Sequence, residues 1–284
     1  MSTQTHKIFH GISDFANQYD HFIVDIWGVL HDGNFAYPGA VAAMEYLKGA
    51  GKQVLLLSNS PNRSQRVVNK VLTPIGIPPH TYQHIITSGE AAHHYMDEHY
   101  KGQRVYTFWD EEIPTALEDL DVERVYSIED ADFIYASLLP YNSQGETYSD
   151  VLQRALDKKL TMICGNPDRV VINSGGLHLC VGTLAEAYEK QGGNVIWFGK
   201  PYKPIYEQAH ELLGRPDPRK IIAIGDGLLT DVGGAVNFGC DVIWNVEGIH
   251  WEEVATNDRI DPHKVKSVLQ DQPQPTGLMH GFKV

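Results

Sequence analysis

The sequence is poor in cysteine and in clustered basic residues. Its three cysteines, Cys164, Cys180 and Cys240, form no CxxC pair, so we predict neither a zinc site nor a redox motif built on paired cysteines. Such sparse cysteine is compatible with a reducing cytoplasm. The formal net charge is -13, and no run of Lys or Arg occurs. Nucleic-acid binding is therefore not expected, because phosphate contacts need clustered cations.

The sequence also lacks long apolar runs. No segment reaches the roughly 20 apolar residues that span a bilayer, and the opening stretch MSTQTHKIFHGISDF has no pattern of a secretion signal. We expect a cytoplasmic protein with no membrane partner. The remaining composition, with 42% hydrophobic and 21% charged residues in 284 positions, is typical of a folded protein of one or two domains.

Short apolar runs alternate with helical patterns along the chain. Residues 21–27 and 53–58 are predicted strands, whereas 38–51 and 64–76 have the spacing and the flanking Pro and Gly residues of helices. Repeated strand and helix units predict an α/β fold in which helices flank a parallel sheet, as in a Rossmann-like domain. Ligands of such sheets bind beyond the carboxyl ends of the strands.

A second series of strands and helices predicts a smaller inserted α/β domain. We place it at 90–192, within a core domain formed by 1–89 and 193–284. The strand at 194–201 is expected to return the chain to the core sheet. The tail from Gln270 is rich in turn residues, and the sequence leaves open whether it wraps the core or stays mobile.

Five polar residues follow predicted strands: Asp25, Ser58, Lys200, Asp226 and Asp231. Taken singly, each is better explained as a cap, a turn residue or a solvated side chain. Together at one sheet edge, the carboxylates would repel one another unless they held a cation, and hard oxygen ligands suit Mg²⁺. A hydroxyl and an ammonium group would neutralise phosphoryl oxygens. The pattern predicts Mg²⁺-dependent phosphoryl transfer with a carboxylate nucleophile.

The order of these segments resembles the haloacid dehalogenase (HAD) superfamily. IVDIWGV, LLLSNS, GKP and GDGLLTD are similar to its four motifs, and GVLHDGNFAYPGA is similar to a turn of its class II subfamily A, which includes nucleotide, sugar phosphate and pyridoxal phosphate phosphatases. The resemblance covers about residues 18–250. It implies an α/β cap domain between motifs two and three, a small phosphorylated metabolite as substrate, and a homodimer that could form through exposed cap surfaces.

The resemblance also implies which residues bind the metal. Asp25 would form an aspartyl-phosphate. The carboxylates of Asp25 and Asp226 and the backbone carbonyl of Trp27 would hold Mg²⁺, and Asp231 would support the water shell of the ion.

For the substrate, the resemblance implies that Ser58 and Lys200 bind phosphoryl oxygens and that Asn59 adds an amide donor. Asp168, in the segment GNPD, would help to form a substrate lid. A turn within the cap explains Asp168 equally well.

Trp27 stands where the family phosphatases have a second aspartate, which protonates the leaving group and activates water. An indole N–H cannot transfer protons in this way, and loss of a general acid–base costs about 10²–10⁴ in rate. His31 and Asp32 are candidate replacements, although Asp32-Gly33 is also an ordinary turn pair. Trp27 itself could be an aromatic wall of the pocket, a packed core residue or a surface for substrate stacking.

Two hypotheses of different classes follow. The first is a Mg²⁺-dependent phosphohydrolase, slow or selective for good leaving groups. The second is a catalytically impaired relative that binds phosphate and metal and acts as a sensor or a partner-binding protein. Phosphotransfer from Asp25 to a second substrate instead of water is a third possibility.

Overall fold

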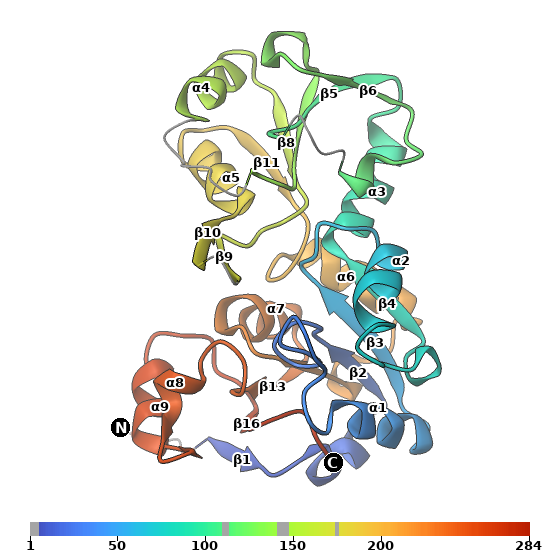
Figure 1. Ribbon diagram of the computed structural model, residues 1–284, viewed down its shortest axis with the longest axis vertical. Helices are drawn as coiled ribbons and strands as arrows, with labels where there is room; N and C mark the ends of the chain where they lie inside the picture. Colours follow the sequence, from blue (N-terminus) through green and yellow to red (C-terminus); the bar gives the residue numbers. More distant parts are fainter. Residues whose placement is uncertain (1–5, 110–113, 141–147, 174–175) are drawn as a thin grey trace. The chain divides into compact units, whose positions relative to one another are not determined.

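The computed structural model describes residues 6–109, 114–140, 148–173 and 176–284. The chain folds into two compact units (Figure 1). The first unit contains Met1–Ser58, Val68–Ile86 and Tyr206–Val284, and the second contains Asn59–Val67 and Thr87–Ile205. The second unit thus takes in stretches on both sides of the predicted cap, 90–192, whose limits stay a prediction.

The first unit is built on a seven-stranded sheet with the order β1-β16-β13-β12-β2-β3-β4. Neighbouring strands from β1 to β3 all run parallel. The strands are β1 (Lys7–Phe9), β2 (His21–Val24), β3 (Gln53–Ser58), β4 (His84–Thr87), β12 (Ile221–Gly225), β13 (Asp241–Asn245) and β16 (Gly277–Met279). Crossover connections join them, which confirms the predicted parallel α/β fold.

Helices flank this sheet. Helix α1 (Ala40–Gly49) packs against β3, and α7 (Gly233–Phe238) packs against β13. The remaining elements of this part include α8 (Trp251–Val254), α9 (Pro262–Val268) and the antiparallel pair β14 (Ala255–Thr256) and β15 (Arg259–Ile260). None of the helices in the described ranges is both long and apolar enough to cross a bilayer.

The central strands are apolar along their whole length because both faces of the sheet are covered. In β12 every residue is buried, and in β13 only the first residue is partly exposed. Phe22 and Trp244 are completely buried. A large apolar side chain that is fully buried contributes about 1.5–3 kcal/mol to stability. The sheet is therefore well packed beneath the loops at its carboxyl edge.

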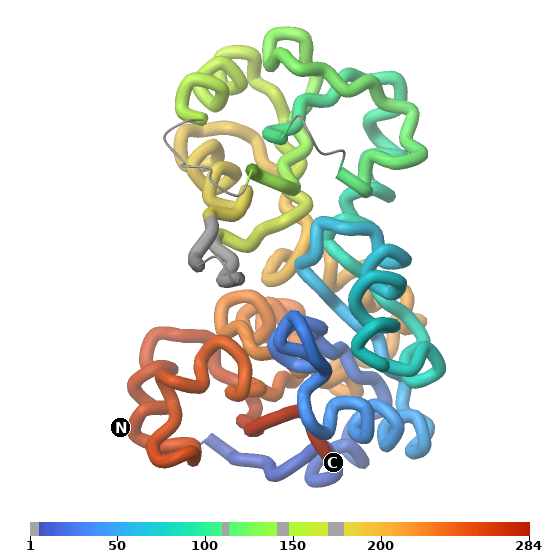
Figure 2. Tube along the Cα trace, viewed as in Figure 1, coloured from blue at the N-terminus to red at the C-terminus, as the bar shows by residue number. Residues whose placement is uncertain are grey.

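Both ends of the chain add strands to the first sheet, which the sequence does not predict. Strand β16 lies between β1 and β13, and the N-terminal and C-terminal segments run side by side in blue and red in Figure 2. Phe282 is completely buried, and Ile12 N donates to Lys283 O at 2.8 Å. The tail from Gln270 therefore wraps the core, which resolves the alternative that the sequence left open.

The second unit has a five-stranded parallel sheet with the order β11-β8-β7-β5-β6. Its strands are β5 (Gln103–Tyr106), β6 (Val122–Val125), β7 (Phe133–Ala136), β8 (Thr161–Cys164) and β11 (Asn194–Trp197), and β9 (Val170–Asn173) and β10 (Gly176–Leu179) form a separate antiparallel hairpin. Helices α3 (Ser88–His99), α4 (Ser149–Asp157) and α5 (Val181–Lys190) accompany the sheet, and α5 packs on β7, β8 and β11.

The expected place of the strand at 194–201 is wrong. Instead of returning to the core sheet, β11 pairs with β8 in the smaller sheet, with Asn194 opposite Thr161. Alternating apolar and helical patterns reveal that a strand exists but do not reveal which sheet it joins. Helix α6 (Lys203–Leu212) follows β11 and carries the chain from the second unit into the first.

The helix expected at 64–76 is shorter and irregular. An α-helical turn at Ser64–Val67 (α2) continues as a π-helical segment at Val68–Leu72. The pair Thr73-Pro74 follows, and the residue before a proline is disfavoured in a helix. The type of element was predicted correctly, whereas its end was placed too late.

Glu90 joins two segments of the second unit. Thr87 caps α3 by accepting from Glu90 N at 3.0 Å, and the Glu90 carboxylate accepts from Arg63 Nε at 2.9 Å and from Ser64 N at 2.8 Å. Burial by itself raises the pKa of Glu90, but hydrogen bonds from His94, Ser64 and Arg63 outweigh it and lower the pKa from the ordinary 4.5 to about 2.

Glu90→Gln is expected to lower the free energy of unfolding at pH 7 by about 2 kcal/mol, because the folded state favours the ionised form. Since the pKa is depressed in the folded state, this contribution is present above pH 4.5 and is lost as the pH falls towards 2. Urea denaturation at pH 7 and at pH 3 measures the difference. Glu98→Gln, on the same helix with a 77% exposed side chain, is the control. An equal loss for both variants would contradict the prediction.

Candidate active site

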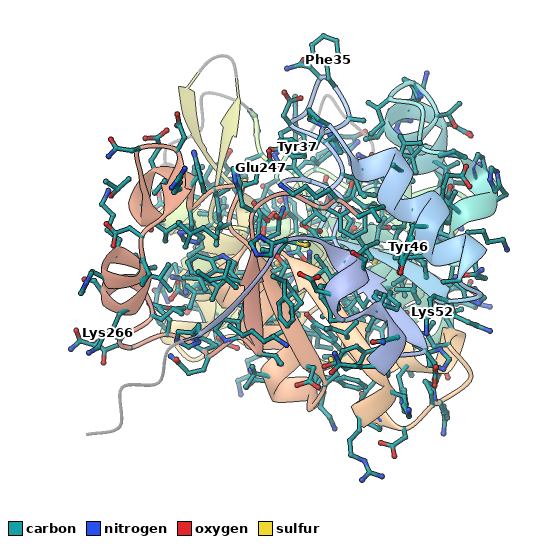
Figure 3. All side chains as sticks on the ribbon, turned by 90° about the horizontal axis from the view of Figure 1, so that it is seen from below. Phe35, Tyr37, Tyr46, Lys52, Glu247 and Lys266 are labelled. Atoms are coloured by element: carbon teal, nitrogen blue, oxygen red, sulfur yellow. The ribbon has the colours of Figure 1, made fainter. Side chains whose placement is uncertain are left out.

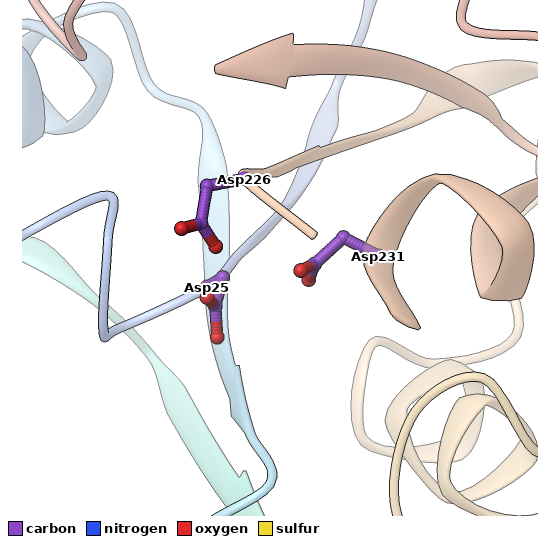
Figure 4. Close-up of side chains that lie close together, drawn as sticks. All are labelled: Asp25, Asp226 and Asp231. Atoms are coloured by element: carbon purple, nitrogen blue, oxygen red, sulfur yellow. The ribbon is translucent and has the colours of Figure 1, made fainter. Parts of the chain in front are cut away.

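Three buried carboxylates meet at the carboxyl edge of the first sheet. Asp25, Asp226 and Asp231 are 7%, 5% and 5% exposed, and each offers an oxygen within 4.8 Å of the others. Figure 4 shows the three side chains close together, with those of Asp226 and Asp231 extending toward Asp25. Like charges this close raise one another's free energy unless a cation lies among them. The predicted convergence of these three aspartates is thus present in the structure.

Neighbouring strands place these groups. Asp25 follows β2, and Asp226 follows β12, which pairs with β2 in parallel register. Asp25 N donates to Ile224 O at 2.9 Å, which extends this pairing by one residue. Ser58 ends β3, on the other side of β2, and is 8% exposed. Three adjacent strand ends of one sheet therefore carry two carboxylates and a hydroxyl.

Gly28 allows the loop after β2 to approach Asp226. Its φ of +82° is in the left-handed region, and a Cβ at this position would lie 2.1 Å from Asp226 Oδ2. Any residue with a side chain would displace the carboxylate. Asp226 is also held from the other side, because Ile249 N donates to its Oδ2 at 3.0 Å and Trp244 Nε1 donates to its backbone oxygen at 2.9 Å.

Asp231 lies in the π-helical turn Leu228–Val232 that follows β12. Its Oδ2 accepts from Gly227 N at 3.1 Å and from Thr230 Oγ1 at 3.3 Å. π-Helical turns of this kind occur frequently at functional sites. The turn directs the carboxylate of Asp231 back toward the end of the strand from which Asp226 emerges.

The donor atoms of this cluster suit a hard divalent cation. All three groups are carboxylates, and buried carboxylates at this separation fit the oxygen coordination of Mg²⁺. Cysteine and histidine ligands, which would favour softer metals, do not belong to the group. Within the described ranges, no other set of three or more acidic, His or Cys side chains brings its ligand atoms this close.

Comparisons with known proteins identify the family of this chain. Residues 22–123 match the family profile of haloacid dehalogenase-like hydrolases, and residues 197–271 match a profile described as HAD-hydrolase-like. A crystal structure of a haloacid dehalogenase-like hydrolase from Brucella suis is 32% identical, covers 96% of this chain and 99% of its own, and superimposes with a TM-score of 0.80. The chain belongs to the haloacid dehalogenase-like hydrolase family.

More distant HAD relatives have more specific descriptions. An acid sugar phosphatase of Staphylococcus aureus is 25% identical over 248 residues, which are 86% of this chain and 93% of that protein. The structure of a p-nitrophenyl phosphatase from Archaeoglobus fulgidus is 21% identical, with a TM-score of 0.73 over 92% of this chain and 95% of its own. At 21% identity, the p-nitrophenyl phosphatase supports only the assignment of the fold.

In the second unit, the side chain of Asn59 binds the backbone of Lys200. Asn59 Oδ1 accepts from Lys200 N at 2.6 Å, and Asn59 Nδ2 donates to Lys200 O at 3.0 Å and to Asp168 Oδ1 at 2.9 Å. A side-chain amide has two N–H donors, so both are already engaged. This geometry makes Asn59 a positioning residue for Lys200 and Asp168, and its predicted direct contact with substrate stays a prediction.

Lys200 and Asp168 differ in exposure. Lys200 is 3% exposed, which is unusual for a lysine because a buried ammonium is costly unless an anion lies near it. Asp168 is half-buried, and its backbone N–H donates to Asn166 Oδ1 at 3.2 Å. This is the local turn that the sequence allowed as the alternative for Asp168. Its role as part of a substrate lid stays a prediction.

Trp27, which is predicted to take the place of a second aspartate, is 49% exposed. Its ring lies edge-on to His31 at 5.1 Å between centroids, and it packs closely over Gly33. Of the predicted alternatives, an indole buried in the core is excluded by this exposure. A pocket wall and a surface for substrate stacking are both compatible with a half-exposed ring.

Asp32 and His31 are the predicted replacements for the missing acid–base group. Asp32 Oδ1 accepts from Asn34 N and Phe35 N, both at 2.8 Å, and these hydrogen bonds lower the pKa of Asp32. His31 is 2% exposed, and burial lowers its pKa. Its Nδ1 accepts from Gly33 N at 2.9 Å, so the ring is neutral. A lowered pKa favours neither residue as a general acid, and the assignment stays a prediction.

Tyr37 and Glu247 were not identified from the sequence. Both are labelled in Figure 3, together with Phe35, which is 74% exposed. Burial and the negative charges of Glu247, Asp226 and Asp32 raise the pKa of Tyr37, so its hydroxyl stays protonated at neutral pH. Tyr37 belongs to the segment GVLHDGNFAYPGA that resembles subfamily A, but the resemblance gives the tyrosine itself no role.

Proposed function

We propose that this protein is a Mg²⁺-dependent phosphohydrolase that acts on small phosphorylated metabolites through an aspartyl-phosphate on Asp25. The observation that carries the proposal is the cluster of three buried carboxylates within 4.8 Å at neighbouring strand ends. Membership in a hydrolase family and the likeness to an acid sugar phosphatase support phosphate esters as the substrate class.

In the proposed reaction, a carboxylate oxygen of Asp25 forms a bond to phosphorus while the ester bond breaks. The leaving oxygen keeps the bonding electron pair and takes a proton from water. A second water then attacks the phosphorus, which releases phosphate and restores the Asp25 carboxylate. Ser58 and Lys200 bind the phosphoryl oxygens and stabilise their growing charge.

Asp25, Asp226, Asp231 and the Trp27 carbonyl would hold the Mg²⁺ ion. When bound, the ion would neutralise the carboxylates and allow an anionic nucleophile to approach a phosphate. Trp27 leaves proton transfer to solvent, so we expect slow turnover of alkyl phosphates and faster turnover of aryl phosphates, whose leaving groups need little protonation.

The test is a screen of sugar phosphates, nucleotides, pyridoxal phosphate and p-nitrophenyl phosphate with Mg²⁺, in which released phosphate is measured. We expect multiple turnovers by the native protein and none by Asp25→Asn. Asp97→Asn, on the exposed side of α3, is the control and should retain full activity. Mg²⁺-dependent ligand binding without product release would contradict the proposal.

Removal of the metal is expected to destabilise the protein as well as to stop turnover. Mg²⁺ that binds only the folded state at about 100 times its Kd adds about 2.7 kcal/mol of stability. Thermal denaturation in EDTA and in excess Mg²⁺ measures this gain. Asp226→Asn should unfold at nearly the same temperature in both buffers. A native protein with one melting temperature in both buffers would be evidence against a metal site.

A further inference from the structure

Asn245 connects the catalytic loop to the end of the chain. It is the last residue of β13 and is completely buried. Its Nδ2 donates to Gly28 O at 3.0 Å, and its Oδ1 accepts from Gly281 N at 3.0 Å. The amide orientation is therefore defined, because a flipped amide would place N–H against N–H and oxygen against oxygen.

Gly28 is the residue after Trp27, whose carbonyl is the proposed metal ligand. Gly28 N donates to His31 O at 2.9 Å, and Gly28 O accepts from Asn245. The peptide between Trp27 and Gly28 is planar, so its C=O points away from its N–H. The hydrogen bond from Gly28 N–H to His31 O and the hydrogen bond from Asn245 Nδ2 to Gly28 O hold both sides of Gly28. Together they therefore fix the direction of the Trp27 carbonyl.

Gly281, the other hydrogen-bond partner of Asn245, lies in a well-anchored segment. Val246 N donates to Met279 O at 2.9 Å, and Asn245 pairs with Met279 in the parallel register of β13 and β16. Gly281 follows this strand by two residues and precedes the completely buried Phe282. The C-terminal segment 277–282 is thus anchored to the sheet on both sides of the hydrogen bond to Asn245.

We propose that Asn245 is a positioning residue that uses the C-terminal segment to aim the Trp27 carbonyl at the metal. The adjacent Trp244 performs a related task for Asp226 by donating to its backbone oxygen. The end of β13 therefore supports both loops that would supply metal ligands. Residues that orient ligands in this way typically change metal affinity by about 10–100-fold when removed. This inference rests on the proposed function.

The test compares Asn245→Ala with Thr276→Val. Thr276 also ties the C-terminal segment to β13, because Val242 N donates to its Oγ1 at 3.1 Å and its hydroxyl donates to Asp241 Oδ1 at 2.7 Å, but at the opposite end of the strand. Calorimetry with Mg²⁺ alone measures affinity, and thermal denaturation in EDTA measures stability. We expect Mg²⁺ affinity to fall at least about 10-fold in Asn245→Ala and to remain unchanged in Thr276→Val.

The outcomes separate the two proposals. If native protein binds Mg²⁺ and Asn245→Ala binds it equally well, Asn245 is only structural and the inference is overturned. If native protein binds Mg²⁺ but hydrolyses no phosphate ester, the proposed function fails while the effect of Asn245 on affinity still stands. If native protein does not bind Mg²⁺, both are wrong. Should Asn245→Ala unfold at the assay temperature, Asn245→Ser, whose hydroxyl can serve one of the two partners, replaces it.

Discussion

Asp25→Asn is expected to lower kcat by about 10⁴-fold or more, because an amide cannot act as the nucleophile and removal of a nucleophile has losses of this size in other hydrolases. Asparagine has the same shape as aspartate, so the loop between β2 and Gly28 should keep its structure. Steady-state release of phosphate with the best substrate of the screen measures the loss. An unchanged kcat would exclude Asp25 as the nucleophile.

The same substitution is expected to stabilise the metal-free protein. Asp25, Asp226 and Asp231 offer oxygens within 4.8 Å of one another, and removal of one charge relieves repulsion on the order of 1–3 kcal/mol. In EDTA, Asp25→Asn should therefore unfold at a higher temperature than the native protein, and excess Mg²⁺ should reduce or reverse the difference. A variant that is less stable than the native protein in EDTA would indicate that the cluster is not under repulsion.

Trp27→Asp is expected to raise kcat on alkyl phosphates by about 10²–10⁴-fold, the contribution of a positioned general acid–base. The new carboxyl group could protonate the leaving oxygen and then activate water. The gain on p-nitrophenyl phosphate should be smaller, because its leaving group needs little protonation. Kinetics with one sugar phosphate and one aryl phosphate measure both gains.

Trp27→Asn is the matched control, since asparagine has the size of aspartate and cannot transfer protons. Both variants lose the contact between the Trp27 ring and His31, so a difference between them reports the new carboxyl group and not the lost ring. Equal activity of the two variants would show that Trp27 does not stand in the place of an acid–base group. Slower turnover by both than by the native protein would instead support a role for the ring in binding substrate.

The fold class and the acidic cluster were predictable because both depend on local patterns. Asp25 and Asp226 follow apolar runs, and parallel strands bring their carboxyl ends to one edge. Lys200 was harder to place. It follows an equally apolar run, but that strand joins the smaller sheet. The periodicity of a strand depends on its own residues, whereas its sheet depends on strands distant in the sequence.

The supporting residues were not predictable. Trp244 and Asn245 end a strand and have no motif of their own, and their partners at Asp226, Gly28 and Gly281 are far away in the chain. Asn59 was expected to contact substrate, and the structure engages both of its donors with protein acceptors. A side-chain amide can bind many partners, so only its neighbours in space decide which it takes.

The sequence by itself determined the parallel α/β architecture and the convergence of the three aspartates, because strand periodicity and motif spacing depend on adjacent residues. It also predicts that Trp27 takes the place of a further aspartate, which stays a prediction. Only the tertiary structure decided that the C-terminal tail becomes a strand between β1 and β13, and that Asn245 links this tail to the loop of Trp27. The physical reason is that these arrangements depend on hydrogen bonds between segments distant in the chain. Such hydrogen bonds do not change the periodicity of apolar residues in either segment.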